Sequence, residues 1–326
     1  MIIRMKTKMT ELLGIQYPIM CGPMLHIAKP ELCAAVSNAG GLGNLTAACY
    51  NNGEELRTAI HETRKLTDKP FSVNVTLLPS MRLTQEILDD FFKVCAEEQV
   101  ACMDVSGSLA TAYMDQMHKA GTKMIHKMGS PRHAKSAERA GYDMVIAAGF
   151  EEGGYPLRDD VATTVLTPSI VEAVNIPVIT TGGMVSGKSF AAALSLGASG
   201  IMMASRFIAT KDCPVHENIK KLILDHDAKD TIIICKKIMQ GRALFNENVR
   251  RIQAIEEEGV NLERIYDMLS GSHSKLAYEN GDTENFTFMV GQSIGLIHDL
   301  PTVEELITRI VAEAIDVTKK NLACFS

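Results

Sequence analysis

Short apolar runs alternate with longer segments of helical spacing along the first two thirds of the chain. Eight runs have the length and composition of buried strands, at 17–21, 42–45, 70–77, 101–105, 123–127, 143–147, 177–181 and 200–204. The segments between them, such as 29–39 and 84–98, place apolar residues at the spacing of an amphipathic helix. Strands that alternate with helices form parallel sheets. Eight such units favour a closed (β/α)8 barrel, with an open doubly wound sheet as the alternative.

The pattern changes from about Cys213 onward. Residues 215–272 are mostly helical in spacing and contain no convincing strand, whereas 302–321 has the pattern of a last amphipathic helix. Thr302 is the expected N-cap of that helix, and Glu304 and Glu305 lie in its first turn. We therefore predict an α/β TIM barrel formed by 1–212 and 302–326. A smaller, mostly helical lid domain is expected at 213–301.

Composition narrows the class of protein. A chain of 326 residues with 46% hydrophobic content can bury a large core. A net charge of −6 and the lack of a basic stripe argue against a nucleic-acid partner. No apolar stretch is long enough to span a membrane, and eight cysteines without a C-x-x-C pair indicate reduced thiols. We expect a cytoplasmic protein that acts on a small molecule, either as a monomer or as a homodimer.

Two consecutive predicted strands end in residues with little or no side chain. Gly182 and Gly183 follow the strand at 177–181, and Ala204 and Ser205 come at the end of the next strand. Small residues let a ligand approach backbone N–H groups, which bind anions. The loops after strands 7 and 8 of a TIM barrel frequently hold phosphate. The two pairs therefore predict a phosphate site, and ordinary helix-start chemistry is the alternative.

Polar side chains at two other strands add candidate chemistry. Lys127 ends the fifth strand, where a cation can stabilise negative charge on a cofactor or phosphate; an exposed lysine is the alternative. His126 alternates with Lys127, so it is expected to point toward the surrounding helices. Asn74 lies inside the third strand and needs hydrogen-bond partners, from a heteroaromatic ring edge or from neighbouring backbone.

The loop after the sixth strand contains Tyr155, which either donates a proton, positions a substrate or simply packs. Glu151 and Glu152 in the same loop are expected to be solvated or structural. The chain lacks the H-E-x-x-H zinc signature, so no metal is expected.

These features together resemble the nitronate monooxygenase / 2-nitropropane dioxygenase family of FMN-dependent TIM barrels. That family includes flavin-dependent NAD(P)H:quinone reductases and the FMN-containing enoyl-ACP reductase. The likeness is carried by 18–24, 39–43, 69–74, 149–154, 181–183, 205–207 and 291–295. Segments 125–127 and 210–214 are most similar to the quinone-reductase-like branch.

The resemblance implies bound FMN. Its phosphate would lie on Gly182, Gly183, Ala204 and Ser205, and Asn74 and Lys127 would contact the polar edge of the flavin. Gly22, Pro23 and Met24 would lie along the isoalloxazine ring. By the same resemblance, the remaining cofactor-binding residues are Gly149, Gly154 and Thr181.

The sequence departs from the family pattern at two places. Tyr155 stands where the family usually has a histidine after Gly-Gly, and a tyrosine with an ordinary pKa of ~10 is a poor base but a competent proton donor. Pro23 replaces a usual glycine and removes a backbone N–H. His26, a few residues beyond the first strand, is a candidate replacement for the missing imidazole.

The resemblance and its departures favour an FMN-dependent oxidoreductase that takes hydride from NAD(P)H and reduces an enoyl or quinone-like acceptor. A nitronate monooxygenase that oxidises alkyl nitronates with O2 is the first alternative. The second alternative is a non-catalytic flavin-binding protein.

Overall fold

The computed structural model describes residues 4–78, 83–156, 158–259, 262–269 and 271–325. The strands of a central barrel are β1 (Ile19–Cys21), β2 (Gly43–Thr46), β3 (Phe71–Leu77), β4 (Cys102–Gly107), β5 (Lys123–Met128), β6 (Met144–Ala148), β7 (Val178–Thr181) and β8 (Gly200–Met203). Two later strands are β9 (Thr231–Ile234) and β10 (Gly241–Leu244). The helices are α1 (Lys8–Leu13), α2 (Pro30–Asn38), α3 (Gly53–Leu66), α4 (Gln85–Glu97), α5 (Met114–Lys119), α6 (Pro131–Arg139), α7 (Thr163–Val171), α8 (Gly187–Ser195), α9 (Ser205–Ile208), α10 (Glu217–Leu224), α11 (Glu247–Glu258), α12 (Leu262–Met268), α13 (Gly271–Asn280) and α14 (Val303–Leu322).

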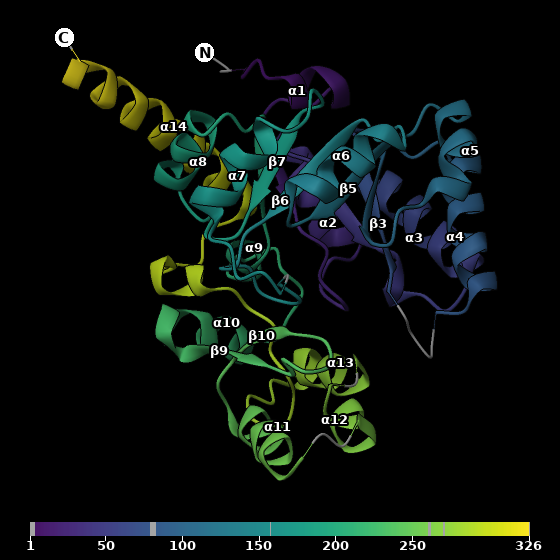
Figure 1. Cartoon of the computed structure of the whole chain (residues 1–326), viewed down its shortest axis with the longest axis vertical. Coiled ribbons are helices and arrows are strands. Elements are labelled where there is room, and N and C mark those ends of the chain that lie inside the picture. The colour runs from purple at the N-terminus through teal and green to yellow at the C-terminus, as the bar shows by residue number, and fades with distance from the viewer. Residues whose placement is uncertain (1–3, 79–82, 157, 260–261, 270, 326) are drawn as a thin grey trace.

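The eight barrel strands are parallel and follow the chain order around a ring. Hydrogen-bonded neighbours run β1-β8-β7-β6-β5-β4-β3-β2, and a parallel bridge between Met20 and Leu42 joins β1 to β2. Helices lie between successive strands on the outside of the barrel (Figure 1). Each predicted strand matches an observed one to within two residues at both ends. The TIM barrel is therefore confirmed, and the open sheet is excluded.

Apolar side chains fill the end of the barrel at which the strands begin. Met9 and Leu13 of α1 belong to the same buried cluster as Met20 and Ile125 from inside the barrel. A Cβ added at Gly200, the first residue of β8, would overlap the Met9 sulfur. The short helix α1 therefore closes this end by direct packing against the strands.

The barrel interior becomes polar further along the strands. Side chains alternate across a strand, so the face of β4 that places Cys102 in the interior cluster also carries Asp104 inward. Asn44 of β2 and Asn74 of β3 lie beside it, and all three residues are almost completely buried. The polar interior lies toward the carboxyl ends of the strands, where TIM barrels place their active sites.

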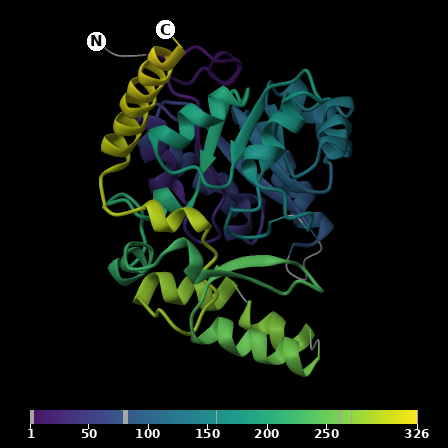
Figure 2. The same ribbon diagram turned by 60° about the vertical axis from the view of Figure 1, so that its left-hand side comes forward.

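The lid region contains an antiparallel hairpin that the sequence analysis did not predict. β9 and β10 pair from Thr231 with Leu244 to Ile234 with Gly241, between the barrel and the lid helices (Figure 2). The expectation of no strand in 215–272 is therefore wrong, although α10 to α13 make the region mostly helical. A run of isoleucines fits a buried strand or a helix face equally well by spacing alone. In the structure, Ile234 at the end of β9 lies in one buried cluster with Ile252 of α11.

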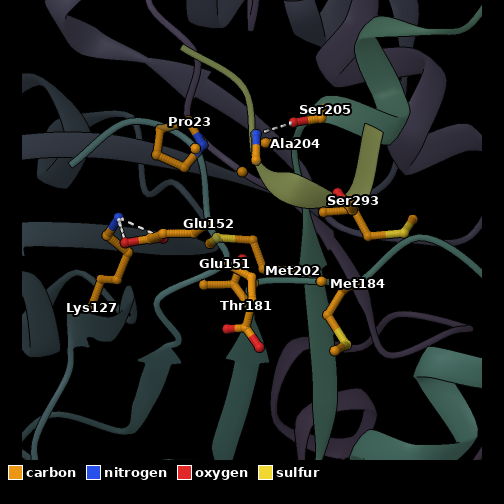
Figure 3. Close-up of a pocket in the computed structure, with 16 residues that line it drawn as sticks. Pro23, Lys127, Glu151, Glu152, Thr181, Met184, Met202, Ala204, Ser205 and Ser293 are labelled. Atoms are coloured by element: carbon orange, nitrogen blue, oxygen red, sulfur yellow. Dashed lines mark hydrogen bonds and ion pairs between the residues drawn. The ribbon is translucent and has the colours of Figure 1, made fainter. Parts of the chain in front are cut away.

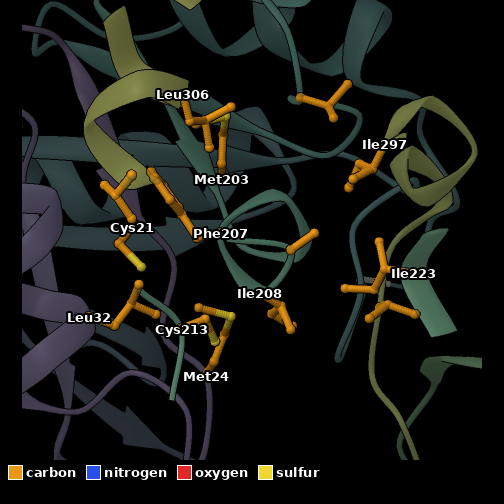
Figure 4. Packing of buried hydrophobic residues seen from close by; sticks show 14 of the residues in the cluster. Cys21, Met24, Leu32, Met203, Phe207, Ile208, Cys213, Ile223, Ile297 and Leu306 are labelled. Carbon is orange, nitrogen blue, oxygen red and sulfur yellow. The ribbon is translucent and has the colours of Figure 1, made fainter. Parts of the chain in front are cut away.

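A second apolar core joins the lid to the outside of the barrel. Phe207 and Ile208 of α9 lie in one buried cluster with Ile223 of α10 and Ile297 (Figure 4). Leu306 of α14 belongs to the same cluster. Because these residues come from both sides of the lid segment, the core fixes the lid over the barrel. The boundaries of the lid at 213 and 301 stay a prediction.

The last helix returns to the barrel as the sequence predicted. Thr302 and Glu305 form a reciprocal capping box, with the Thr302 N–H donating to Glu305 Oε2 at 2.8 Å. At Gly187 of α8, an added Cβ would come within 2.5 Å of the Ala314 nitrogen and the Ile310 oxygen of α14. The Gly187 N–H also donates to Glu313 Oε2 at 2.6 Å. The close crossing of α8 and α14 therefore depends on a glycine.

No helix within the described ranges combines the length and the apolar content needed to cross a bilayer. All eight cysteines lie in those ranges and are free thiols, as their spacing predicted, and six of them are buried.

The contact between α8 and α14 generates a stability prediction. We expect Gly187→Ala to lower the free energy of unfolding by roughly 1–3 kcal/mol, because the new methyl group forces the two helices apart. Urea unfolding followed by circular dichroism measures the change. Lys188→Ala, at the exposed next position of α8, is the control and should stay within about 0.5 kcal/mol of wild type. Equal stability of the Gly187→Ala variant and the control would contradict the packing described above.

Candidate functional site

A cavity opens at the carboxyl ends of the barrel strands. Figure 3 shows the residues around it. The cavity is lined by Gly22, Pro23, Lys127, Glu151, Glu152, Gly153, Thr181, Gly182, Gly183, Met184, Met202, Met203, Ala204, Ser205, Gly291 and Ser293.

The structure brings eight of the residues expected at the site together in this cavity. They come from the ends of four strands and are Gly22, Pro23, Lys127, Thr181, Gly182, Gly183, Ala204 and Ser205. The Ser205 hydroxyl accepts a hydrogen bond from the Gly291 N–H at 3.1 Å, which joins the end of β8 to the segment before α14. Residues on six separate segments of the chain thus share one cavity.

The glycine pair after β7 has the geometry of an anion cradle. Gly182 and Gly183 have φ values of +95° and +73°, a region that L side chains rarely adopt. Among the hydrogen bonds of the described residues, neither N–H donates to a protein acceptor. A Cβ at Gly183 would meet no atom within 4 Å, so the space beside this backbone is open. These two amides can bind a phosphate or another anion without displacing a protein contact.

An ion pair, largely withdrawn from water, lines the same cavity. Lys127 Nζ lies 3.2 Å from Glu152 Oε2, and the two side chains are 21% and 7% exposed. Burial raises the pKa of the Glu152 carboxyl, while the Lys127 ammonium opposes that shift. Of the two expectations for Glu152, solvated or structural, the buried ion pair agrees with the structural one. His126 points away from the cavity as predicted, and its ring packs 5.2 Å from that of Tyr142.

Two segments of the chain hold the loop that carries Glu152. At Gly153, an added Cβ would lie 2.6 Å from the Gly291 nitrogen, so the segment before α14 crosses directly over the loop. On the other side, the backbones of Gly154 and Arg242 form an antiparallel bridge. The buried Arg242 side chain lies 4.5 Å from the centre of the Phe150 ring. Sequence reasoning missed Arg242, because nothing local distinguishes it from an exposed arginine.

Glu151, in contrast, is a structural residue, as expected. Its carboxylate accepts hydrogen bonds from the Thr163 N–H at 3.0 Å and from the Thr163 hydroxyl at 2.7 Å, at the start of α7. A Cβ at Gly149 would overlap that same hydroxyl. Gly149 therefore has a packing reason to be glycine, and it does not line the cavity.

Asn74 is buried inside the barrel and does not line the cavity. Its amide donates to the backbone oxygen of Asp104 at 3.0 Å and to Asp104 Oδ2 at 3.2 Å. The hydrogen bond to the Asp104 backbone agrees with the expectation that Asn74 bonds to neighbouring backbone. The hydrogen bond to the Asp104 carboxylate was not predicted. Asp104 is completely buried, and this burial raises its pKa to about 6.

The other expected site residues lie outside the cavity lining. Met24 is buried in the core beside it, and its N–H donates to Thr46 Oγ1 at 3.0 Å. His26 has a left-handed backbone with φ of 63° and contacts the region of Gly271 at the start of α13. Tyr155 is 38% exposed, and the partial burial of its side chain raises the pKa of its phenol.

The described lining residues offer backbone donors for an anionic group at one place and a cation at another. The free amides of Gly182 and Gly183 suit the anionic end. The remaining space is bordered by the Lys127 ammonium and by Gly22 and Pro23, whose side chains are absent or short. This arrangement is able to hold a phosphorylated cofactor without rearrangement of a protein hydrogen bond at the glycine pair.

Comparison with known proteins gives consistent results. The nitronate monooxygenase family model matches residues 6–109 and 93–313. A Rhodococcus jostii protein named (3aS,4S,5R,7aS)-5-hydroxy-7a-methyl-1-oxo-octahydro-1H-indene-4-carboxyl-CoA dehydrogenase is 31% identical, over 95% of this chain and 96% of its own. A probable nitronate monooxygenase of Staphylococcus aureus is 28% identical, over 88% and 92%.

Solved structures show the same architecture. FabK from Thermotoga maritima superposes with a TM-score of 0.91 and 38% identity, covering 98% of this chain and 99% of its own. The relatives carry the names of a dehydrogenase and a monooxygenase, which are both oxidoreductases. The chain is thus an oxidoreductase that belongs to the nitronate monooxygenase family.

Proposed function

We propose that this protein is an FMN-dependent oxidoreductase that accepts hydride from NAD(P)H and reduces an enoyl or quinone-like acceptor. One observation carries the proposal most directly. The open amides of Gly182 and Gly183 and the Lys127 ammonium line the same cavity at the carboxyl ends of the barrel strands. A phosphorylated flavin needs a site for its phosphate and a cation near the ring, and this cavity offers both.

The phosphate end of the site follows from the backbone. Gly182 and Gly183 would donate their N–H groups to phosphate oxygens, and Ala204 and Ser205 border the same space without bulky side chains. Charge-assisted hydrogen bonds of this kind are about twice as strong as neutral ones. Thr181, the last residue of β7, would border the phosphate site next to the glycine pair.

The ring end of the site follows from Lys127. Bound FMN supplies the hydride chemistry, and the protein positions and tunes it. Lys127 would stabilise negative charge at the polar edge of the ring, and its bond to Glu152 holds the ammonium in place. Gly22 and Pro23, which line the cavity at the end of β1, would lie along the flat ring.

Tyr155 favours a reductase over a nitronate monooxygenase. Burial and the nearby Cys235 and Tyr266 raise its pKa, so the phenol keeps its proton near neutral pH. A protonated phenol donates a proton and does not abstract one. We therefore propose Tyr155 as the proton donor to a substrate that lies between the cavity and the lid at 213–301. His26, the other candidate for a catalytic role, lies outside the cavity lining.

A second candidate function is nitronate oxidation with O2. It is supported by the family match and by the similarity to the probable nitronate monooxygenase of Staphylococcus aureus. Oxygen uptake with propionate 3-nitronate and none with NAD(P)H would favour it. Bound FMN without turnover on any acceptor would instead indicate a non-catalytic flavin-binding protein.

Rapid mixing of the FMN-loaded protein with NADH and with NADPH tests the proposed function. We expect at least one of them to remove the visible flavin absorbance under anaerobic conditions. Tyr155→Phe should slow the later reoxidation by an enoyl or quinone acceptor by roughly 100-fold, the usual contribution of a proton donor, and leave the first step nearly unchanged. Absorbance that neither nucleotide removes would rule out the reductase.

Substitution in the glycine pair tests where the phosphate binds. We expect Gly183→Ala to weaken FMN binding by about tenfold or more, which corresponds to about 1.4 kcal/mol, because the methyl group occupies the cradle and alters its backbone. Gly121→Ala is the matched control: Gly121 also has positive φ and open space around its Cβ position, but it precedes β5 at the far end of the barrel. Fluorescence titration with FMN measures both affinities. Equal losses in the two variants would contradict the assignment.

A further inference from the structure

A buried carboxyl group lies inside the barrel at Asp104 of β4, and neither the proposed hydride chemistry nor the phosphate site uses it. Asp104 is 0% exposed, and within the part of the chain that the structure describes, the hydrogen bonds to its carboxylate reach one oxygen, Oδ2. Asn44 donates to that oxygen at 3.3 Å, and Asn74 donates to it at 3.2 Å. The other oxygen, Oδ1, has no hydrogen-bond partner among the described residues.

The side-chain oxygen of Asn44 also lacks a hydrogen-bond partner. This atom, Oδ1, is buried, and no partner lies within the described part of the chain. The two unpartnered oxygens thus belong to two groups that one N–H···O bond already joins. A single proton on Asp104 Oδ1, donated to Asn44 Oδ1, would complete a cyclic acid–amide pair. It would also remove both unsatisfied atoms, which are costly in a buried site.

Electrostatics connect this pair to the cavity. Lys127 lowers the pKa of Asp104 and Glu152 raises it, while burial is the largest cause of the overall upward shift. Cys102 on the same strand and Tyr142 beyond the barrel wall are also electrostatically coupled to Asp104. The Asp104 and Glu152 carboxyl groups therefore both interact with the Lys127 ammonium. A further negative charge beside Lys127 makes it unfavourable for both carboxyl groups to be ionised at once.

We propose that Asp104 neutralises added negative charge in this site: it takes up one proton from solvent on Oδ1 when negative charge develops beside Lys127, and releases it when that charge is removed. The proton is held between Asp104 and Asn44, and no other bond forms or breaks. Asp104 is a positioning and charge-balancing residue, because it touches Asn74 and Asn44 and does not line the cavity.

Infrared spectroscopy of the cofactor-free protein tests the proton site directly. We expect a protonated-carboxyl carbonyl band that grows as the pH falls through about 6, the pKa of Asp104. The band should remain in Glu152→Gln, which removes the other buried carboxyl, and in the control Asp143→Asn, whose residue pairs with Lys123 at the opposite end of the barrel. It should be missing from Asp104→Asn. An unchanged band in Asp104→Asn would overturn the proposal.

Folding stability gives a second readout on the same cofactor-free variants. Since folding raises the pKa of Asp104 from 3.8 to about 6, its contribution to stability is present at low pH and is lost as the pH rises from about 4 to about 6. We expect Asp104→Asn to lack this decline relative to wild type, because an amide cannot ionise. If the variant does not fold, isotope labelling of aspartate carboxyls identifies the band in the wild-type protein. A label that does not shift the band contradicts the proposal.

The charge response itself rests on the proposed binding of FMN. In the loaded protein, we expect the midpoint potential to fall more steeply with pH above about 6 in wild type than in Asp104→Asn, because only the wild type takes up the extra proton on reduction. Identical slopes in the two proteins would overturn the proposal. Failure of the protein to bind FMN would overturn the proposed function instead, and the infrared result would still stand.

Discussion

The ion pair between Lys127 and Glu152 is the interaction on which the site depends. A lysine at the end of β5 and a glutamate from the loop after β6 are both largely withdrawn from water, so each requires the other. The pair fixes the loop against the barrel. The loop is in turn held from above, where the segment at Gly291 crosses Gly153 without room for a side chain. The cavity wall is thus built by three segments that are far apart in the sequence.

The barrel divides its interior between two tasks. The end where the strands begin is filled with apolar side chains and closed by α1, which stabilises the fold. The other end carries Asn44, Asn74 and Asp104 inside the ring and the glycine pair at its rim. Buried polar groups weaken a core unless they are fully hydrogen-bonded. The position of these three side chains toward the carboxyl ends of the strands agrees with a binding role there.

The sequence predicts most of the barrel and part of the site, for identifiable physical reasons. Strands buried on both faces appear as short apolar runs, and small residues at their ends mark the cavity rim at Gly182 and Gly183. The hairpin at β9 was missed because an isoleucine run does not distinguish strand from helix. For Glu152, the sequence left a solvated and a structural role open, because the loop that carries it is packed against Gly291, a contact that no local pattern reveals. The orientation of Asn74 likewise depends on Asp104 of a neighbouring strand.

The most direct test of the central claim compares the affinities of FMN and riboflavin, which differ only in the phosphate. If the amides of Gly182 and Gly183 clasp that phosphate, FMN should bind roughly 100-fold more tightly, the equivalent of about 2.7 kcal/mol from charge-assisted hydrogen bonds. Calorimetric titration of the cofactor-free protein with each compound gives the ratio. Equal affinities for the two flavins would contradict a phosphate site at the ends of β7 and β8.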